Sequence, residues 1–507
     1  MKRTLALANL KFNPLMVLLG LNFIVIGLGF TEFFAPISGD TSIYAYYGRQ
    51  INHGLILYRD LWDFKSPGIY YLFALLFKLL PDSLTTLRLS AVVANILASF
   101  LIYRISIRFF SISIALTGSA IYLLVTNLGG YFNKDGPFPE TYIPLLGVIG
   151  FYFWIRFLEN KNSGLGLFSA GLFAGTQVVL KQSSISLILS YLFCIVWVAP
   201  FINRAKARHL LFFFLGVLSA ILPWLFYFYF ANVWSDFWSS VVLYPRLYAG
   251  STPLRDQTQG MLALISSSMQ VHGIMWMLSA MGLVFLITAR RILADDASEK
   301  IRILLPWIGF GLILIILPGR FYERYLMEIL IPAIFLCEYA LSRISSVQSF
   351  EMRILKVVAA CFFILAVVVQ QSSRSLHMID DRLVSHVLTR SESLAKDPLF
   401  LRPDVTVFAW GDPRIPYVTE AQSGVKWLNI EPFLTSCSYV TVQVVGDLMS
   451  ELTTHPPLYF IESPARPLIS ESCLKDTRVV DFIADNYKNK ITVGDAIIYI
   501  LNTADKQ

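Results

Sequence analysis

Acidic, basic and aromatic side chains are concentrated between residues 32 and 83, a stretch flanked on both sides by strongly apolar sequence. Its candidate functional residues are Asp40, Tyr44, Tyr58, Asp60, Asp63 and Lys65. A carboxylate can accept the proton of an attacking hydroxyl group, and a lysine ammonium can neutralise a phosphate leaving group. These residue types therefore suit transfer chemistry on a phosphorylated, lipid-linked substrate.

Further ionisable residues stand at or near the ends of other apolar stretches, namely Glu140, Lys181, Arg320 and Arg324. Because charged side chains in or beside a bilayer are costly, their positions are the best indication of a functional site in an apolar chain. The sequence contains no glycine-rich phosphate-binding loop, no Gly-x-Ser-x-Gly elbow and no Cys-x-x-Cys pair. The candidate site therefore depends on these scattered acids and bases.

Simpler interpretations of the same residues stay open at this point. Asp40 could be a solvated loop acid, and Lys65 could anchor the chain to lipid headgroups. Snorkelling alone would explain Lys181, which stands where an apolar stretch ends. The two arginines could simply pair with Glu323 and Glu328.

The chain has 507 residues, of which 56% are hydrophobic and 15% are charged, and its mean hydropathy is +0.61. A soluble globular chain has about 25% charged residues, so the composition excludes a soluble protein and predicts an α-helical polytopic membrane protein. A spanning helix needs about 20 apolar residues. Eleven such spans are predicted: Pro14–Thr31, Leu84–Tyr103, Phe109–Leu128, Thr141–Leu158, Gly164–Leu180, Gln182–Asn203, Leu210–Trp234, Met261–Ala289, Ile303–Pro318, Tyr325–Leu341 and Val357–Gln371.

A twelfth apolar stretch, Gly68–Leu80, lies between two prolines and is too short to cross, so it predicts an interfacial helix. With eleven spans and a cytoplasmic N-terminus, the inside segments of residues 1–371 hold 17 Lys and Arg residues, and the outside loops and outer span ends of the same region hold 11, in agreement with the positive-inside rule. This places the loop 32–83, the loop 127–140 and the whole chain after Gln371 outside the cytoplasm. The net charge of +7 arises from the membrane region, so nucleic-acid binding is not implied.

Residues 1–371 thus form a predicted transmembrane domain, and residues 372–507 form a predicted small extracytoplasmic α/β domain. Its cysteines, Cys437 and Cys473, would meet an oxidising compartment and either form a disulfide or remain buried free thiols. Short β-rich runs alternate there with a helical pattern. The predicted strands are Val405–Ala409, Tyr439–Val445, Leu458–Ile461 and Ala496–Leu501, and the predicted helix is Val479–Asn486.

The spacing of the first-loop residues resembles that of a known family. The motif reads Gly39-Asp40-x-x-x-Tyr44, then Gly54-x-x-x-Tyr58-Arg59-Asp60-x-x-Asp63-x-Lys65-x-Pro67-Gly68. It resembles the first loop of the bacterial family 39, protein mannosyltransferase-like and aminoarabinose-transferase-type glycosyltransferases of the GT-C class. The resemblance extends to the tail, at Trp410-Gly411-x-Pro413 and Pro456-Pro457-x-Tyr459.

This resemblance implies an inner-membrane enzyme that transfers a sugar from a polyprenyl-phosphate donor to an acceptor glycan, lipid or protein on the outer side, with inversion. Asp40 matches the acid that activates the acceptor, and Glu140 matches the acidic position of the second loop. Lys65 matches the lysine that faces the donor phosphate, with Lys181 and Arg320 as further candidates. Supporting roles are implied for Tyr44, Tyr58, Asp60, Asp63 and Arg324.

One departure from the family pattern concerns a metal ion and the sugar. In the aminoarabinose branch an acid directly precedes the phosphate lysine, whereas Phe64 stands there in this chain and Asp63 is displaced by one position. A divalent metal ion held by Asp63 or Glu140 is therefore an open expectation, and aminoarabinose is disfavoured as the sugar. The alternative function is a polytopic lipid or glycan transporter or flippase, which should place its ionisable residues near the bilayer midplane.

Overall fold

The protein is described from a computed structural model. The described residues are 13–28, 37–127, 136–160, 164–198, 203–250, 252–292, 300–346, 394, 397–400, 404–435, 437–462, 468, 472–493 and 496–502. The predicted span Val357–Gln371 and the predicted domain boundary at Gln371 lie outside these residues.

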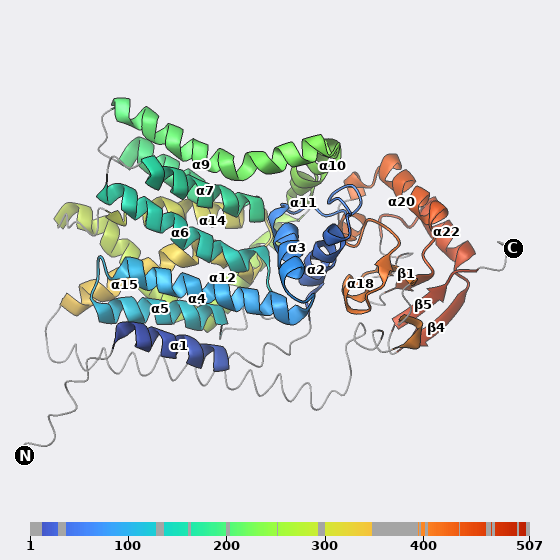
Figure 1. Ribbon diagram of the computed structural model, residues 1–507, viewed down its shortest axis with the longest axis horizontal. Helices are drawn as coiled ribbons and strands as arrows, with labels where there is room; N and C mark the ends of the chain where they lie inside the picture. Colours follow the sequence, from blue (N-terminus) through green and yellow to red (C-terminus); the bar gives the residue numbers. More distant parts are fainter. Residues whose placement is uncertain are drawn as a thin grey trace, which may run out of the picture.

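A bundle of long apolar helices makes up the first part of the chain (Figure 1). Its helices are α1 (Pro14–Leu28), α4 (Leu84–Ser106), α5 (Ile112–Asn127), α6 (Pro139–Glu159), α7 (Gly164–Leu180), α8 (Ser186–Phe193, continued by a π-helical turn to Val198), α9 (Asn203–Phe230), α12 (Leu254–Ile292), α14 (Leu304–Ile316) and α15 (Met327–Ser346, preceded by a 3-10 turn from Glu323). Each coincides with one of the first ten predicted spans. Five of the described helices are long and apolar enough to cross a membrane unaided, and six more are shorter apolar helices.

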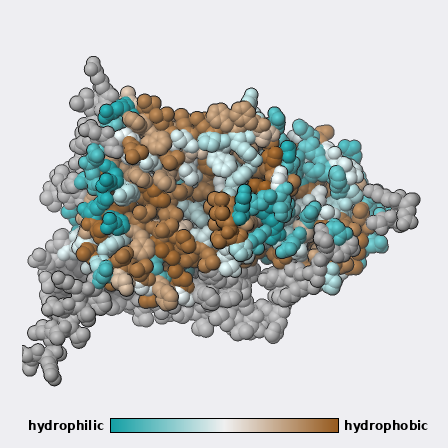
Figure 2. Space-filling model, viewed as in Figure 1, coloured by the Kyte–Doolittle hydropathy of each residue, from teal (hydrophilic) through white to brown (hydrophobic). Residues whose placement is uncertain are grey.

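The outer surface of this bundle is apolar. Figure 2 shows brown residues over the helices, whereas teal residues gather at the ends of the bundle and over the C-terminal domain. Exposed side chains on α9 include Leu211, Phe214, Leu218 and Phe226. Such a surface is stable in hydrocarbon rather than in water, and together with the helix lengths it confirms a multi-span membrane protein.

Close packing inside the bundle depends on small residues that let helices touch and that leave room for a buried acid. A side chain at Gly171 of α7 or at Gly216 of α9 would collide with the backbone of the facing helix, so glycine lets the two helices touch. Glu338 of α15 is fully buried and accepts a hydrogen bond of 2.5 Å from the Ser106 hydroxyl of α4. Because Gly118 of α5 has no side chain, the Glu338 carboxylate can occupy the space beside it.

Short helices occupy the end of the bundle that faces the C-terminal domain (Figure 1). They are α2 (Gly39–Asn52), α3 (Gly68–Leu79), α10 (Trp234–Trp238) and α11 (Tyr244–Gly250), the last two joined by a π-helical turn. The helix predicted over Gly68–Leu80 is present as α3, and its 12 residues are too few to cross the bilayer.

The C-terminal domain combines helices with a five-stranded sheet, which agrees with the predicted α/β class, although two of the five strands were not predicted. Its elements are β1 (Thr406–Trp410), α18 (Arg414–Val418), β2 (Gln422–Ser423), α19 (Glu431–Thr435), α20 (Val442–Thr454), β3 (Tyr459–Glu462), α22 (Arg478–Asn486), β4 (Asn489–Val493) and β5 (Ala496–Ile500). The strand order is β2-β1-β3-β5-β4, with β1 parallel to β2 and β3, and β5 antiparallel to β3 and β4.

One predicted strand is wrong. Residues 439–445 are rich in β-branched side chains, but helix α20 begins at Val442. The side chain of Thr441 caps this helix by accepting a hydrogen bond from the backbone N–H of Val444. Leu448 and Leu452, four residues apart, are fully buried on one face of the helix. Tertiary packing of that face outweighs the local preference of the valines for a strand.

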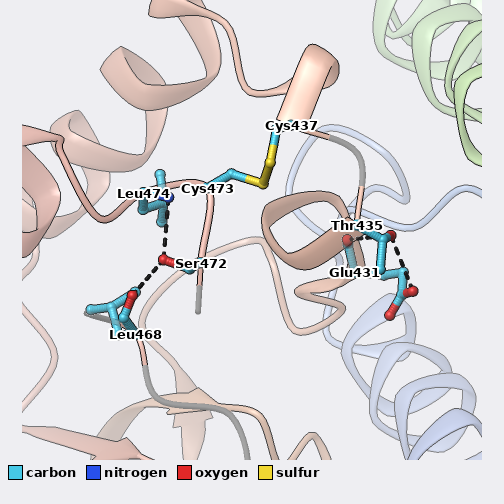
Figure 3. The surroundings of a disulfide bond; sticks show 7 residues. All are labelled: Glu431, Thr435, Cys437, Leu468, Ser472, Cys473 and Leu474. Carbon is cyan, nitrogen blue, oxygen red and sulfur yellow. Dashed lines mark hydrogen bonds between the residues drawn. A yellow bond between two sulfur atoms is a disulfide. The ribbon is translucent and has the colours of Figure 1, made fainter. Parts of the chain in front are cut away.

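A disulfide joins Cys437 and Cys473, which settles the alternative left open by the sequence (Figure 3). It connects the chain just after α19 to the segment before α22, and the backbone N–H of Cys473 also donates to the Phe433 carbonyl at 2.7 Å. Among the described cysteines the free ones are Cys194 and Cys337, both buried in the bundle.

Removing this disulfide should destabilise the C-terminal domain. The bond closes a segment with a sequence separation of 36, so the Cys437→Ser/Cys473→Ser double variant should lose roughly 2–4 kcal/mol of unfolding free energy. Thermal melts of the purified protein with and without reductant would measure the loss. A reductant effect of equal size in the double variant would contradict the assignment.

Candidate active site

Asp40 is placed by the first turn of α2. Ser38 caps this helix, and its side chain accepts a hydrogen bond from the backbone N–H of Thr41. Asp40 therefore lies in the first turn of a helix whose start is fixed by a side-chain cap. Tyr44, one turn later, is buried, and its ring centroid lies 4.9 Å from the Lys65 ammonium. Asp40 and Tyr44 thus meet Lys65 from the same helix.

The Asp40 carboxylate lies between two cations. Lys65 Nζ is 3.1 Å from its Oδ1, and Arg324 Nη2 is 2.8 Å from its Oδ2. Burial alone would raise the pKa of Asp40, but Lys65 and Arg324 outweigh it and hold the pKa below its usual range. Burial would conversely lower the pKa of Lys65, but Asp40 and Asp63 raise it well above its usual value. Both groups are therefore charged at neutral pH.

A second group of ion pairs adjoins the first. Lys181 Nζ lies 3.2 Å from carboxylate oxygens of both Glu140 and Glu328, and the Nε of Arg324 lies 3.8 Å from Glu140. Arg324 therefore connects the two groups. Lys181 does not snorkel, because its side chain is only 14% exposed and its ammonium lies 4.1 Å from the centroid of the Tyr325 ring.

Four helix ends and one loop bring these charges together. Asp40 begins α2, Glu140 lies in the first turn of α6, and Lys181 directly follows α7. Arg324 and Glu328 lie at the start of α15. The suggestion that Arg324 pairs only with its neighbours in sequence is wrong.

Sequence reasoning missed Glu328 as a site residue. Its side chain is 5% exposed, and besides Lys181 it accepts a hydrogen bond of 2.5 Å from the Ser184 hydroxyl. An acid at the start of an apolar span was the available signal, since such a residue normally has a functional or paired role.

The loop that carries Lys65 is held to the end of α7. Gln182 donates a hydrogen bond of 2.9 Å to the Phe64 carbonyl, and its side-chain oxygen accepts one of 3.0 Å from the Ser66 backbone N–H. The Tyr58 hydroxyl donates to the Lys65 carbonyl at 2.8 Å. A side chain at Gly68 would lie 2.6 Å from the Val179 carbonyl, so only glycine allows this approach. These contacts hold the loop that carries Lys65 against the end of α7, which Lys181 directly follows.

Of the remaining predicted site residues, Asp63 contacts this cluster, whereas Arg320 and Asp60 have other partners. The guanidinium of Arg320 lies 4.0 Å from the centroid of the Tyr248 ring. Asp60 accepts hydrogen bonds from the Arg59 side chain and from the Ile56 backbone, and so stabilises its own turn. Asp63 is fully buried, 3.9 Å from Lys65.

The acids proposed as metal ligands do not form a cation site in the described part of the chain. Nowhere among the described residues do three His, Cys, Asp or Glu side chains gather as metal ligands. Glu140 already faces Lys181 and Arg324, whereas Asp63 faces Lys65 and the side-chain amide of Asn429. Both acids therefore already have cationic partners within the chain itself.

A narrow cavity opens beside Lys181. Its lining includes Lys181, Ser186 and Glu328 together with apolar residues of α14 such as Leu314 and Ile315. The hydroxyl of Ser186 and the Oε2 of Glu328 have no hydrogen-bond partner in the part of the chain that the structure describes. The cavity therefore joins an apolar wall to the charged cluster.

Comparison with known proteins supports the predicted resemblance. Residues 64–227 match the family model described as dolichyl-phosphate-mannose-protein mannosyltransferase. No curated protein sequence matches the chain significantly.

Among solved structures, ArnT from Cupriavidus metallidurans bound to undecaprenyl phosphate superposes with a TM-score of 0.59 at 12% identity, covering 97% of this chain and 98% of that one. An oligosaccharyltransferase from Archaeoglobus fulgidus, tethered to an acceptor peptide, gives a TM-score of 0.49 at 12% identity, covering 89% and 69%. The conclusion about the fold depends on the first superposition. Together with the family match, it confirms the resemblance predicted from the first-loop motif: the chain has the fold of the GT-C membrane glycosyltransferases.

Proposed function

We propose that the protein transfers a sugar from a polyprenyl-phosphate donor to a hydroxyl group of a glycan, lipid or protein acceptor at the outer face of the cytoplasmic membrane, with inversion. The observation that carries this proposal is the Asp40 carboxylate, held at a helix start between Lys65 and Arg324. The family match and the bound undecaprenyl phosphate of ArnT support a lipid-linked donor. The transferred sugar is a hexose or a pentose.

The donor phosphate would bind where the cations converge. Lys65, Arg324 and Lys181 are connected through shared acids, and Arg320 lies nearby on Tyr248. A phosphodiester carries one negative charge, and hydrogen bonds from ionised donors to phosphate are among the strongest in proteins. The small cavity beside Lys181 lies between this cluster and apolar residues of α14.

Donor binding would also activate the base. In the free protein Lys65 and Arg324 neutralise Asp40, which makes it a weak proton acceptor. A phosphate that draws these cations away would raise the basicity of the carboxylate. Asp40 would thus become effective only when a donor is present.

The proposed chemical step is a single displacement. The acceptor oxygen forms a bond to the anomeric carbon while its proton moves to Asp40. The bond between the anomeric carbon and the phosphate oxygen breaks, and its electron pair remains on the phosphate. Lys65 and Arg324 stabilise this developing charge, and attack from the opposite face inverts the anomeric centre.

A flippase is the less favoured alternative. Transporters place ionisable groups near the bilayer midplane, whereas Glu140, Lys181 and Glu328 all lie at helix ends. Incubating the purified protein in lipid nanodiscs with polyprenyl-phosphate sugars would separate the two functions, because a transferase releases the polyprenyl phosphate. Mass spectrometry of the lipid-linked sugars that accumulate in a deletion strain would identify the donor.

The orientation of the chain in the membrane gives a further testable prediction. The excess of basic residues in the inside segments places Gln507 outside the cytoplasm. A C-terminal alkaline phosphatase fusion should therefore be active in an exporting bacterium, and a green fluorescent protein fusion should be dark. The opposite pattern would refute the eleven-span topology and the outward-facing site.

Replacing Lys65 by Ala should weaken donor use. Losing a charge-assisted hydrogen bond to the phosphate should cost about 1.5–3 kcal/mol in kcat/KM for the donor. Lys65→Arg should recover part of this loss. Steady-state kinetics with varied donor would measure it, and Lys78→Ala, an exposed lysine at the end of α3, is the control. Unchanged donor kinetics in Lys65→Ala would remove this residue from the site.

A further inference from the structure

The segment of the C-terminal domain between β2 and α19 contacts the first loop directly. The backbone N–H of Trp62 donates to the Lys426 carbonyl at 2.8 Å, and the Tyr47 hydroxyl lies within hydrogen-bond distance of the same carbonyl, at 3.2 Å. Three residues further along, the Nδ2 of Asn429 donates to the Oδ1 of Asp63 at 3.1 Å. Two residues after Asp63 in the same loop comes Lys65. The contact between the domains therefore reaches the proposed phosphate site.

The orientation of Asn429 is fixed by its own surroundings. Its side-chain oxygen accepts a hydrogen bond of 3.1 Å from the backbone N–H of Glu431, at the start of α19. The amide nitrogen must then point to Asp63. Asn429 is 9% exposed, and its neighbours Leu428 and Ile430 are buried. The amide is thus a rigid donor supplied by the C-terminal domain.

Asp63 is fully buried, and its two oxygens have different partners. Oδ1 accepts hydrogen bonds from the backbone N–H of Phe64 at 2.7 Å and from Asn429. Among the described residues Oδ2 has no hydrogen-bond partner, and it lies 3.9 Å from Lys65 Nζ. A lysine or arginine in this place would cancel the charge of the carboxylate. The neutral amide instead fixes the position of the carboxylate and leaves its charge in place. The full negative charge of Asp63 therefore acts on Lys65.

We propose that Asn429 is a positioning residue for the donor phosphate, acting through Asp63 to hold Lys65 in place. The inference rests on the proposed function. When a phosphate draws Lys65 away from Asp40, Asp63 remains as the fixed counter-charge that keeps the ammonium in the site. The C-terminal domain thereby completes the donor site, although it supplies no group that touches the donor.

The test is a set of variants assayed with varied donor and with varied acceptor. Asn429→Ala should lower kcat/KM for the donor by about 2- to 10-fold, the range expected when one hydrogen bond to a buried charge is lost indirectly. The KM for the acceptor should not change. Asn489→Ala, an exposed asparagine of the same domain, is the matched control and should behave as wild type.

A double-variant comparison separates positioning from mere support of the fold. In the Lys65→Ala background, Asn429→Ala should cause almost no further loss, because its effect passes through Lys65. A structural role would give losses that multiply. If Asn429→Ala does not fold, Asp63→Asn provides the same information, since it keeps an acceptor for Asn429 and removes only the charge that faces Lys65.

The outcomes distinguish this inference from the proposed function. If the wild type is active but the donor KM and kcat are unchanged in Asn429→Ala or in Asp63→Asn, the proposed role of Asn429 is wrong and the proposed function still stands. Multiplying losses in the Lys65→Ala background would also contradict that role. A wild type that neither transfers sugar nor binds undecaprenyl phosphate would instead overturn the proposed function.

Discussion

Asp40→Asn should lower the rate of sugar transfer by about 10²–10⁴-fold, the usual contribution of a general base. The amide keeps the size of the side chain, and its single oxygen can still accept a hydrogen bond from either Lys65 or Arg324, which contact Oδ1 and Oδ2 of the carboxylate at 3.1 and 2.8 Å. It cannot take up the acceptor proton. Turnover of the purified variant with its lipid-linked donor, together with a thermal melt, would measure the effect.

Asp82→Asn is a close control for this experiment. Asp82 is also an ion-paired acid outside the bundle, bonded to Arg49, and its side chain is 29% exposed against 28% for Asp40. It should lose little activity. A folded Asp40→Asn variant with nearly wild-type turnover would move the base elsewhere, and Glu140 would be the next candidate.

The pH dependence of the wild type should reflect the same ion pairs. In the free protein the pKa of Asp40 lies below its usual range because Lys65 and Arg324 outweigh the effect of burial. The acid limb of kcat/KM, which reports the free protein, should therefore lie below about pH 4. The acid limb of kcat should lie higher, because the bound phosphate competes for both cations. Coincident limbs would contradict donor-dependent activation of Asp40.

Lys181→Met should lower the free energy of unfolding by about 3–5 kcal/mol, because it leaves two carboxylates buried without their cation. Glu140 and Glu328 are 6% and 5% exposed, and both lie 3.2 Å from the lysine ammonium. Arg324, at 3.8 Å from Glu140, would compensate for only one of them. Melting of the purified protein in detergent, compared with Lys78→Met at an exposed position, would measure the loss.

A second substitution tests the physical reason for this loss. Adding Glu328→Gln to Lys181→Met removes one unpaired charge but keeps an acceptor for the Ser184 hydroxyl, so stability should partly return. Wild-type stability in the single variant would show that the three charges do not depend on one another. An unchanged loss in the double variant would assign the effect of Lys181 to packing.

The sequence by itself determined the features that depend on local patterns. Ten predicted spans correspond to described helices because length and apolarity alone decide whether a segment suits a membrane. In the C-terminal domain, β-rich runs and a helical pattern correctly predicted the positions of β1, β3, β5 and α22. The spacing of Asp40, Lys65 and Pro67 likewise singled out the loop that carries the candidate base, Asp40, and the proposed phosphate ligand, Lys65.

Only the tertiary structure decided which charges meet. Arg324 pairs with Asp40 across a sequence separation of 284, and Asn429 reaches Asp63 across 366. Glu328 joins Lys181 because the start of α15 packs beside the end of α7. Spacing along the chain does not encode these contacts, since they arise where helix ends from distant spans and a separate domain pack together. The energy of a buried ion pair depends on that three-dimensional arrangement and on its exclusion of water.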